Sequence, residues 1–341
     1  MHLEQNVALF DQASDDILLL DFSFINLKFY KVGSPEFIEL VDSFYKYIDI
    51  AFTGADGLQH ISKADYESTI FYSQQYTRSS GYRPNLFALV PIDMNHVVEE
   101  ETYHLVEKVL LIMFPSDVKL THLIRFGKRQ GELKFTEEAT YLWDVNSRWY
   151  LAENRNPDEF LLRCAEEEIE AANRFVVKAY RFLKDTHDFQ LAIESYIECF
   201  HQRALKMAYV NLCMALESIV KAESEITHRI CRTCAVINAD NKEQGHQIYF
   251  NVKQFYTLRS KIVHGDNSAN LHKYFFNLTA LASRTLIELI TFRASNRKVL
   301  ERMVLESGFG DKRHFSNDYQ KEDFNRRVSD LAIAPVPKYK S

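Results

Sequence analysis

Residues that interrupt helices are scarce in this chain, and this scarcity constrains its fold more than any other feature. Only 10 glycines and 7 prolines occur among 341 residues. Because these two residues end helices and build tight turns, so few of them favour long helices over many short strands. Hydrophobic residues make up 46% of the chain, enough to bury a core, and the length favours two domains over one.

The region up to about residue 155 has a mixed pattern. A dense apolar stretch at 17–30 is compatible with a pair of strands, and 87–92 reads as a further strand. Ser34-Pro35 is a typical helix start, with serine as the cap and proline in the first turn. A helix is expected at 97–114, followed by strand-like alternation at 118–136.

Beyond a polar stretch around Pro157, apolar residues recur at helical spacing almost throughout. The expected helices cover residues 160–184, 191–199, 201–222, 225–236, 247–264 and 274–293. We therefore predict an α+β protein that is mainly α. A mixed α/β domain at 1–155 precedes a helical bundle at 156–310, and a charged tail follows at 311–341.

The charge balance limits how the chain can bind nucleic acid. The net charge is −6 and the isoelectric point is near 6.1, whereas a protein that coats nucleic acid is normally basic. Binding to RNA would therefore need a local basic patch. The cysteine count is five, and this odd number argues against a disulfide framework.

No targeting or membrane segment is expected. Glu4 and Asp11 flank only a short apolar stretch, which does not match a signal peptide. The best candidate for a membrane span, at 278–292, contains Arg284 and Glu288 in its interior. We expect a cytoplasmic location and no membrane partner.

The most suggestive chemistry lies at 256–265, where Arg259 and His264 stand near the end of an expected helix. Histidine exchanges protons near neutral pH, and the arginine fork suits phosphate. Together they are sufficient to cut RNA without a metal or a cofactor. The pair alone is weak evidence, since Arg181 and His187 form a similar pair in a charged segment.

Three sequence blocks strengthen this interpretation. They are Ala215–Ile219, Glu225–Ile230 and Leu258–Gly265, in this order, within roughly residues 200–290. In this order the blocks resemble the HEPN superfamily, and within it the Apea-like branch. Where that family often has Asn, Asp or His after the arginine, this chain has Ser260. The resemblance implies a HEPN-type helical bundle in the C-terminal domain.

The resemblance also implies an activity and an assembly. The activity is that of an endoribonuclease, in a toxin or an antiviral defence effector. His264 would act as the general base on a ribose 2′-hydroxyl, and Arg259 would stabilise charge on the phosphoryl oxygens. The products would be a 2′,3′-cyclic phosphate and a 5′-hydroxyl. Two copies would form a homodimer across the 247–264 helices. The N-terminal domain would sense a signal or restrain the nuclease, through a regulatory protein or ligand.

Two further residues are expected to support the pair. Ser260 lies four residues before His264, on the same helix face, and can hold it. Glu217 stands in an apolar helix, where a glutamate is seldom buried without a partner. It either orients Arg259 or His264, or forms a structural ion pair with a cation such as Arg229 or Lys221.

Three cationic or titratable residues are candidate RNA contacts, namely Lys261, Arg229 and His228. For His228 and Arg229 the alternative is an ordinary capped helix start. Cys231 and Cys234 follow His228, but a zinc site usually needs a second pair of ligands. We therefore expect buried cysteines and no metal.

A purely structural interpretation of the pair is also available. Arginine and histidine at a helix C-terminus complement the helix dipole. The alternative function is therefore a catalytically inactive HEPN-like module for dimerisation or for binding a nucleotide or RNA. A toxin of the kind paired with a nucleotidyltransferase antitoxin is disfavoured, because Asp266 stands where that group has a tyrosine.

Overall fold

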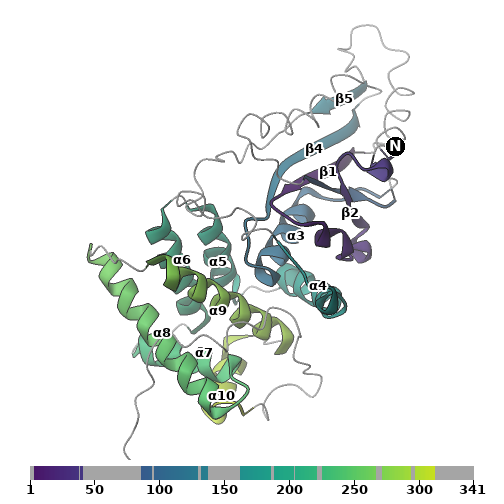
Figure 1. Cartoon of the computed structure of the whole chain (residues 1–341). Coiled ribbons are helices and arrows are strands. Elements are labelled where there is room, and N and C mark those ends of the chain that lie inside the picture. Colours follow the sequence, from purple (N-terminus) through teal and green to yellow (C-terminus); the bar gives the residue numbers. More distant parts are fainter. Residues whose placement is uncertain are drawn as a thin grey trace, which may run out of the picture. The chain divides into compact units, whose positions relative to one another are not determined.

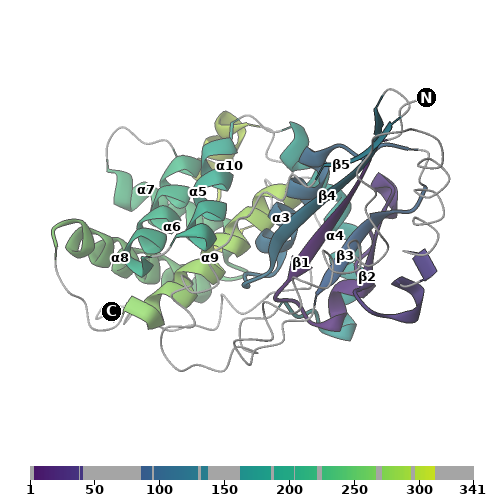
Figure 2. The same ribbon diagram turned by 90° about the horizontal axis from the view of Figure 1, so that it is seen from above.

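The structure is a computed structural model that describes residues 4–37, 39–40, 86–93, 96–129, 132–136, 162–185, 188–202, 204–220, 225–265, 271–292 and 296–311. It divides into two compact units (Figures 1 and 2). The sheet unit comprises Met1–Glu107, Ser116–Asp144 and Pro157–Ile169; the helical unit comprises Lys108–Pro115, Val145–Asn156 and Glu170–Ser341. The chain is thus α+β and mainly α, as expected. The boundary expected near residue 155 lies outside the described residues.

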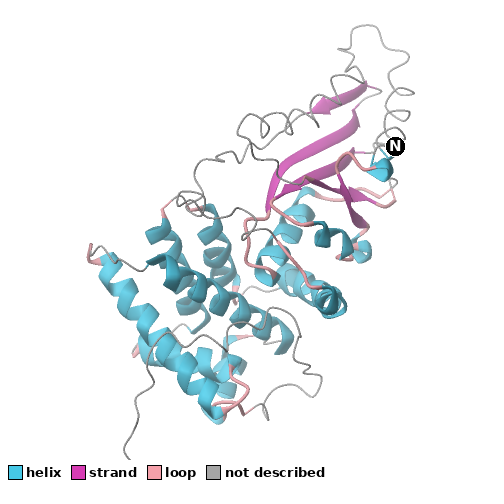
Figure 3. Cartoon of the chain, viewed as in Figure 1, coloured by secondary structure: helices cyan, strands magenta, loops and turns pink. Residues whose placement is uncertain are grey.

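The sheet unit is built on five strands in the order β2-β3-β1-β4-β5, and every neighbouring pair is antiparallel (Figure 3). The strands are β1 (Glu4–Asp11), β2 (Leu27–Lys31), β3 (Phe87–Pro91), β4 (Lys119–Arg129) and β5 (Glu132–Thr136). The central strand β1 was not expected from the sequence. Its residues 7–10 are all buried, so the strand lacks the alternation that marks a half-exposed one.

Most other expectations for this unit are confirmed. β3, β4 and β5 lie within the expected strand regions, and α3 (Glu100–Met113) lies within the expected helix. Ser34 accepts a hydrogen bond from the backbone N–H of Phe37 at 3.2 Å, as a helix cap does. The strand pair expected at 17–30 is wrong. Two short 3₁₀ helices, η1 (Asp15–Leu19) and η2 (Ser23–Ile25), precede the single strand β2 there.

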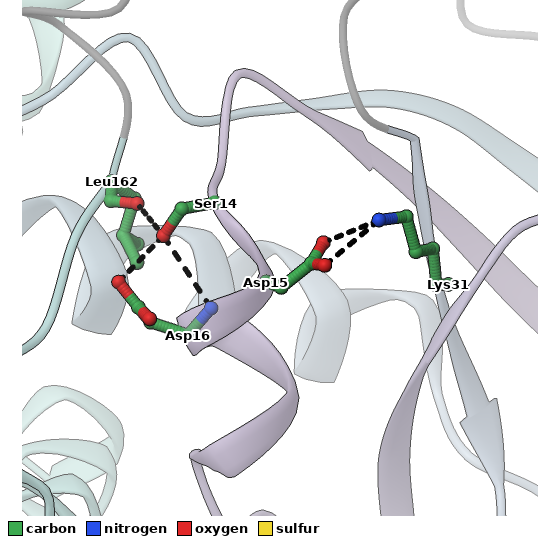
Figure 4. A network of polar contacts seen from close by, with 5 residues as sticks. All are labelled: Ser14, Asp15, Asp16, Lys31 and Leu162. Carbon is green, nitrogen blue, oxygen red and sulfur yellow. Dashed lines mark hydrogen bonds and ion pairs between the residues drawn. The ribbon is translucent and has the colours of Figure 1, made fainter. Parts of the chain in front are cut away.

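A backbone clasp holds the segment before α4 in the sheet unit, and Figure 4 shows the bond that the hydroxyl of Ser14 adds to it at the carbonyl of Leu162. The N–H of Leu162 donates to the carbonyl of Gln12 at 3.0 Å, and the carbonyl of Leu162 accepts from both the N–H and the hydroxyl of Ser14. Beside the clasp, Lys31 pairs with Asp15 at 2.7 Å. The helix expected from residue 160 is therefore wrong at its start, since residues 162–165 are not helical.

The helical unit contains the remaining helices. They are α4 (Ile169–Asp185, preceded by η6, Glu166–Glu168), α5 (Gln190–His201), α6 (Leu205–Val220), α7 (Ile226–Asn238), α8 (Lys242–Val263), α9 (Leu271–Phe292) and α10 (Arg297–Glu306). The five helices α5 to α9 match the expected segments, and α8 begins five residues earlier than expected. The helix α10 was not among the expected segments, although it lies within the bundle predicted at 156–310. The last turn of α3 also belongs to this unit, and Tyr196 and Ser283 donate to its otherwise unpaired carbonyls.

The helix α9 is the core of this unit. By length and composition, Tyr274–Phe292 is the one stretch in the described part of the chain apolar enough to cross a membrane, but 83% of it is buried within the fold. Arg284 and Glu288 form a buried ion pair on it. Asn238 of α7 donates to Thr285 at 2.9 Å.

The segment after α10 packs against the start of α8. The Arg232 guanidinium donates to the carbonyls of Val304 and Ser307, both at 3.0 Å, and so caps the end of α10. Phe309 then lies directly on the backbone of Gly245. A Cβ atom at Gly245 would be 2.3 Å from the Cβ of Phe309, so only glycine fits without a shift.

This contact predicts that Gly245→Ala lowers stability. Alanine normally favours a helix interior by about 1 kcal/mol over glycine. Here it must displace Phe309, and overpacking typically costs about 1–3 kcal/mol. A lower midpoint of thermal unfolding is expected. Gly308→Ala is the matched control, because its nearest contact would be 3.9 Å away. Equal effects from the two variants would contradict the packing described here.

Candidate functional site at the end of α8

The C-terminal half of α8 lies against α6 through a row of polar contacts. Tyr209, Cys213 and Glu217 follow one another at four-residue spacing, which places them on one face of α6. The hydroxyl of Tyr209 donates to the carbonyl of Phe255 at 3.1 Å, and that of Tyr256 donates to the carbonyl of Cys213 at 2.9 Å. The two helices are therefore held in a defined register at this end.

The row ends in an ion pair between Arg259 and Glu217. The Nη2 atom of Arg259 lies 3.2 Å from one oxygen of the carboxylate and 3.3 Å from the other. The side chains are 32% and 27% exposed, so the pair is partly shielded from water. The Nε of Arg259 is buried and has no hydrogen-bond partner among the described residues. Glu217 contacts only Nη2, whereas a guanidinium carries five N–H donors.

The environment of Glu217 shifts its titration. Burial raises the pKa of the Glu217 carboxyl above its ordinary value, and the charge of Arg259 and the hydroxyl of Tyr256 offset part of that rise. Loss of solvation is therefore the larger effect. Tyr256 was not singled out in the sequence. The signal for it was its position three residues before Arg259, on the face of α8 that packs against α6.

His264 lies just beyond the last residue of α8 and is exposed. Its backbone N–H donates to the carbonyl of Ser260 at 3.1 Å, so the contact that joins these two residues is made by the backbone. Gly265 has a φ of +89°, the left-handed conformation with which helices commonly end. In the part of the chain that the structure describes, no hydrogen bond or ion pair engages the imidazole of His264.

Arg259 and His264 point in different directions within one subunit. A step of five residues turns about 140° around a helix. Arg259 faces α6, where Glu217 holds it, whereas His264 faces solvent together with Ser260 and Lys261. The structure thus brings Glu217 and Arg259 together, and it places the imidazole at the free end of the same helix.

The other expected RNA contacts lie further along the hairpin of α7 and α8. His228 on α7 is hydrogen-bonded through Nδ1 to the hydroxyl of Tyr249 at 2.8 Å. Tyr249 precedes Arg259 by about 15 Å along α8, at 1.5 Å per residue. His228 and the exposed Arg229 therefore do not join the cluster around Arg259.

The cysteines offer no metal site in the described residues. Cys231 and Cys234 are buried and unbridged. Burial is the main cause that raises the pKa of the Cys231 thiol to about 12 and also raises that of Cys234, which opposes the thiolate form needed for a metal. Across the described ranges, no group of three or more His, Cys, Asp or Glu side chains is placed to hold an ion. His187 and Lys221 lie outside those ranges.

No protein-family model, curated protein or solved structure matches this chain. The assignment to the HEPN superfamily is therefore a proposal.

The raised pKa of Glu217 predicts a pH-dependent contribution to stability. As pH rises above the ordinary value of 4.5, the unfolded chain loses this proton before the folded one does. The contribution of Glu217 to the free energy of unfolding is therefore fully present below pH 4.5. It is lost as pH rises through the pKa of this carboxyl in the folded protein. Glu217→Gln should gain stability relative to the wild type across that window.

Denaturant unfolding at a series of pH values measures this difference. Arg259→Met is the informative companion, because removing the cation should raise the pKa of Glu217 further and widen the window. Parallel stability profiles for the wild type and Glu217→Gln would rule out the desolvation of this carboxylate.

Proposed function

We propose that this protein is a metal-independent RNA endonuclease of HEPN type that acts as a toxin or an antiviral defence effector. The observation that carries the proposal is the arrangement of side chains at the end of α8. There, Arg259 is oriented by Glu217 and keeps donors that Glu217 does not use, and an exposed His264 follows within five residues. The resemblance of the three sequence blocks supports the same activity.

The proposed reaction uses the 2′-hydroxyl of the substrate as the nucleophile. His264 takes the proton from this hydroxyl, and the oxygen attacks the adjacent phosphorus. The bond from phosphorus to the 5′-oxygen breaks, and that oxygen takes up a proton. Arg259 stabilises the charge on the phosphoryl oxygens. Glu217 is a positioning residue, because it touches Arg259 and not the substrate. The products are a 2′,3′-cyclic phosphate and a 5′-hydroxyl.

The directions of the two side chains favour a site shared between two copies. Within one subunit Arg259 faces α6 while His264 faces solvent, so one helix end does not surround a phosphate. An isologous dimer brings a second His264 to the opposite side, where it can protonate the leaving oxygen. Val263, an apolar residue that is 59% exposed, lies next to His264 and suits such a contact. We place the contact at the last turns of α8.

The alternative is an inactive HEPN-like module for dimerisation or for binding a nucleotide or RNA. One observation favours it, since Glu217 already pairs with Arg259 and reduces its net charge. In either case we propose that the N-terminal sheet unit senses a signal, recruits the protein or restrains the helical unit, through a regulatory protein or ligand.

Cleavage of RNA in excess chelator is the direct test. The wild type should cut, because the proposed catalytic groups are the imidazole of His264 and the guanidinium of Arg259, neither of which needs a metal. His264→Ala should lower the rate by roughly 10²- to 10⁴-fold, the usual contribution of a general base. His201→Ala is a matched control, since His201 also ends a helix but lies outside the candidate site. Activity lost in chelator and restored by a divalent ion would exclude the mechanism. Binding without cleavage would favour the inactive module.

Mixed dimers test the shared site. Wild-type subunits mixed with an excess of tagged His264→Ala subunits should lose most activity in the purified heterodimer, because each cleft needs both imidazoles. Sedimentation measures the assembly in parallel. A monomer that cuts at full rate on dilution would contradict the composite site.

A further inference from the structure

The hairpin of α7 and α8 carries a local positive charge in an acidic protein. Residues 225–265 contain six lysines and arginines against three acidic residues, while the whole chain has a net charge of −6. The three acids are Glu225, Asp240 and Glu243, which lie at the start of α7, in the turn and in the first turn of α8. Between 244 and 264 no acidic residue occurs. Of the six cations, Arg232 and Arg259 are engaged within the fold, by the end of α10 and by Glu217. The part of the hairpin that is basic towards solvent is therefore α8 beyond its first turn, where Lys253 and Lys261 are exposed and the helix carries no acid beside them. This is the local basic patch that an acidic protein needs to bind RNA.

Polar and basic side chains line the outer face of α8 from Lys253 to His264, and His246 lies on the same face about two turns before Lys253. At 3.6 residues per turn, His246, Lys253, Thr257, Ser260 and His264 fall within about 60° of one another around the helix axis. All of these residues are exposed, except that His246 is half-buried. Together they form a strip that ends at the candidate site, and His246 and His264 are about five turns apart.

A cluster of rings stands at the far end of this strip from His264. His228 and Tyr249 lie edge to face with ring centres 5.8 Å apart, and their side chains are hydrogen-bonded. Phe309 lies edge to face with His246 at 5.4 Å and 6.4 Å from Tyr249. His228 is exposed and the other three are half-buried, so the cluster keeps ring surface in contact with water. We call these four residues the ring cluster.

The chemistry next to the ring cluster selects its ligand. Arg229 and Lys253 are both exposed; Arg229 follows His228 on α7, and Lys253 lies one turn beyond Tyr249 on α8. Rings beside cations are what single-stranded nucleic acid requires, because bases stack on the rings and phosphates meet the cations. Bases in a duplex are paired and do not offer these faces.

We propose that the ring cluster is a second contact for the substrate, and that it binds an unpaired base of a single-stranded RNA lying along the outer face of α8. The inference rests on the proposed function and names its substrate class. Tyr249 lies about 22 Å from His264 along the helix. A stacked strand covers that length with about six nucleotides at 3.4 Å each. The dimer contact is then confined to the last turns of α8, beyond Lys253.

Binding of a non-cleavable strand tests the inference apart from catalysis. The probe is a labelled ten-nucleotide 2′-O-methyl oligouridine, and fluorescence anisotropy with the full-length protein gives the dissociation constant. Tyr249→Leu should weaken binding roughly tenfold, within the range for loss of one stacked base. Tyr249→Phe keeps the ring and should bind like the wild type, which separates stacking from misfolding. Phe24→Leu, at an exposed ring in the sheet unit, should have no effect.

The salt dependence supplies a second readout. Lys253→Gln should lower the slope of log affinity against log salt by about 0.7, the amount for one phosphate contact to a single strand. Lys298→Gln, an exposed lysine on α10, is the control and should leave the slope unchanged. Wild-type affinity in Tyr249→Leu, or equal affinity for a duplex of the same length, would overturn the inference.

The two proposals fail in different ways. If Tyr249→Leu weakens binding but the wild type cuts no RNA, the nuclease is wrong and the ring cluster stands as a binding surface. If RNA is cut with the same KM by Tyr249→Leu and the wild type on decamers, the ring cluster is not part of the substrate site. The inference predicts a raised KM for decamers and an unchanged one for trinucleotides, which are too short to reach Tyr249.

Discussion

The ion pair between Glu217 and Arg259 is the interaction on which the candidate site depends. It joins α6 to α8 at the end of a row of tyrosine hydrogen bonds and directs the guanidinium towards α6. A partly exposed pair of this kind adds little net stability, because the cost of desolvation offsets the attraction. Its effect is orientation. With Arg259 held, the end of α8 projects His264 to solvent, and the proposed nuclease needs a second copy of the chain to complete its site.

The distribution of charge matters as much as the pair itself. An acidic chain repels RNA at long range, so attraction must come from a patch within about one Debye length, roughly 8–10 Å at physiological salt. The proposed patch is the solvent face of α8 beyond its first turn, because Lys253 and Lys261 are exposed there and no acidic residue occurs between 244 and 264. The packing of Phe309 on Gly245 fixes one ring of the ring cluster in place. Both the structure and the charge distribution therefore favour RNA contact along α8 over contact with the rest of the protein surface.

The sequence predicted what short-range patterns determine. The scarcity of glycine and proline and the helical spacing of apolar residues identified α5 to α9. Contacts between segments that are distant in sequence could not be predicted from these local patterns. The strand β1 was missed because a fully buried strand does not alternate. Leu162 was taken as helix, although its backbone is hydrogen-bonded to Gln12 and Ser14. Glu217 was expected to need a cation, but only packing shows that this is Arg259. His228 was a candidate RNA contact near the pair, and it is instead hydrogen-bonded to Tyr249, about 15 Å along α8 from Arg259.

In the proposed mechanism, a ribose 2′-hydroxyl that is activated by His264 cuts the RNA strand without a metal. The most direct measurement uses an RNA oligonucleotide with one favoured cleavage site, compared with the same oligonucleotide lacking only the 2′-hydroxyl at that site. Mass spectrometry then identifies the fragment ends in excess chelator. The account predicts cyclic phosphate and 5′-hydroxyl ends from the first and no cut at that bond in the second. Cleavage at the deoxy position, or fragments with 5′-phosphate ends, would contradict it.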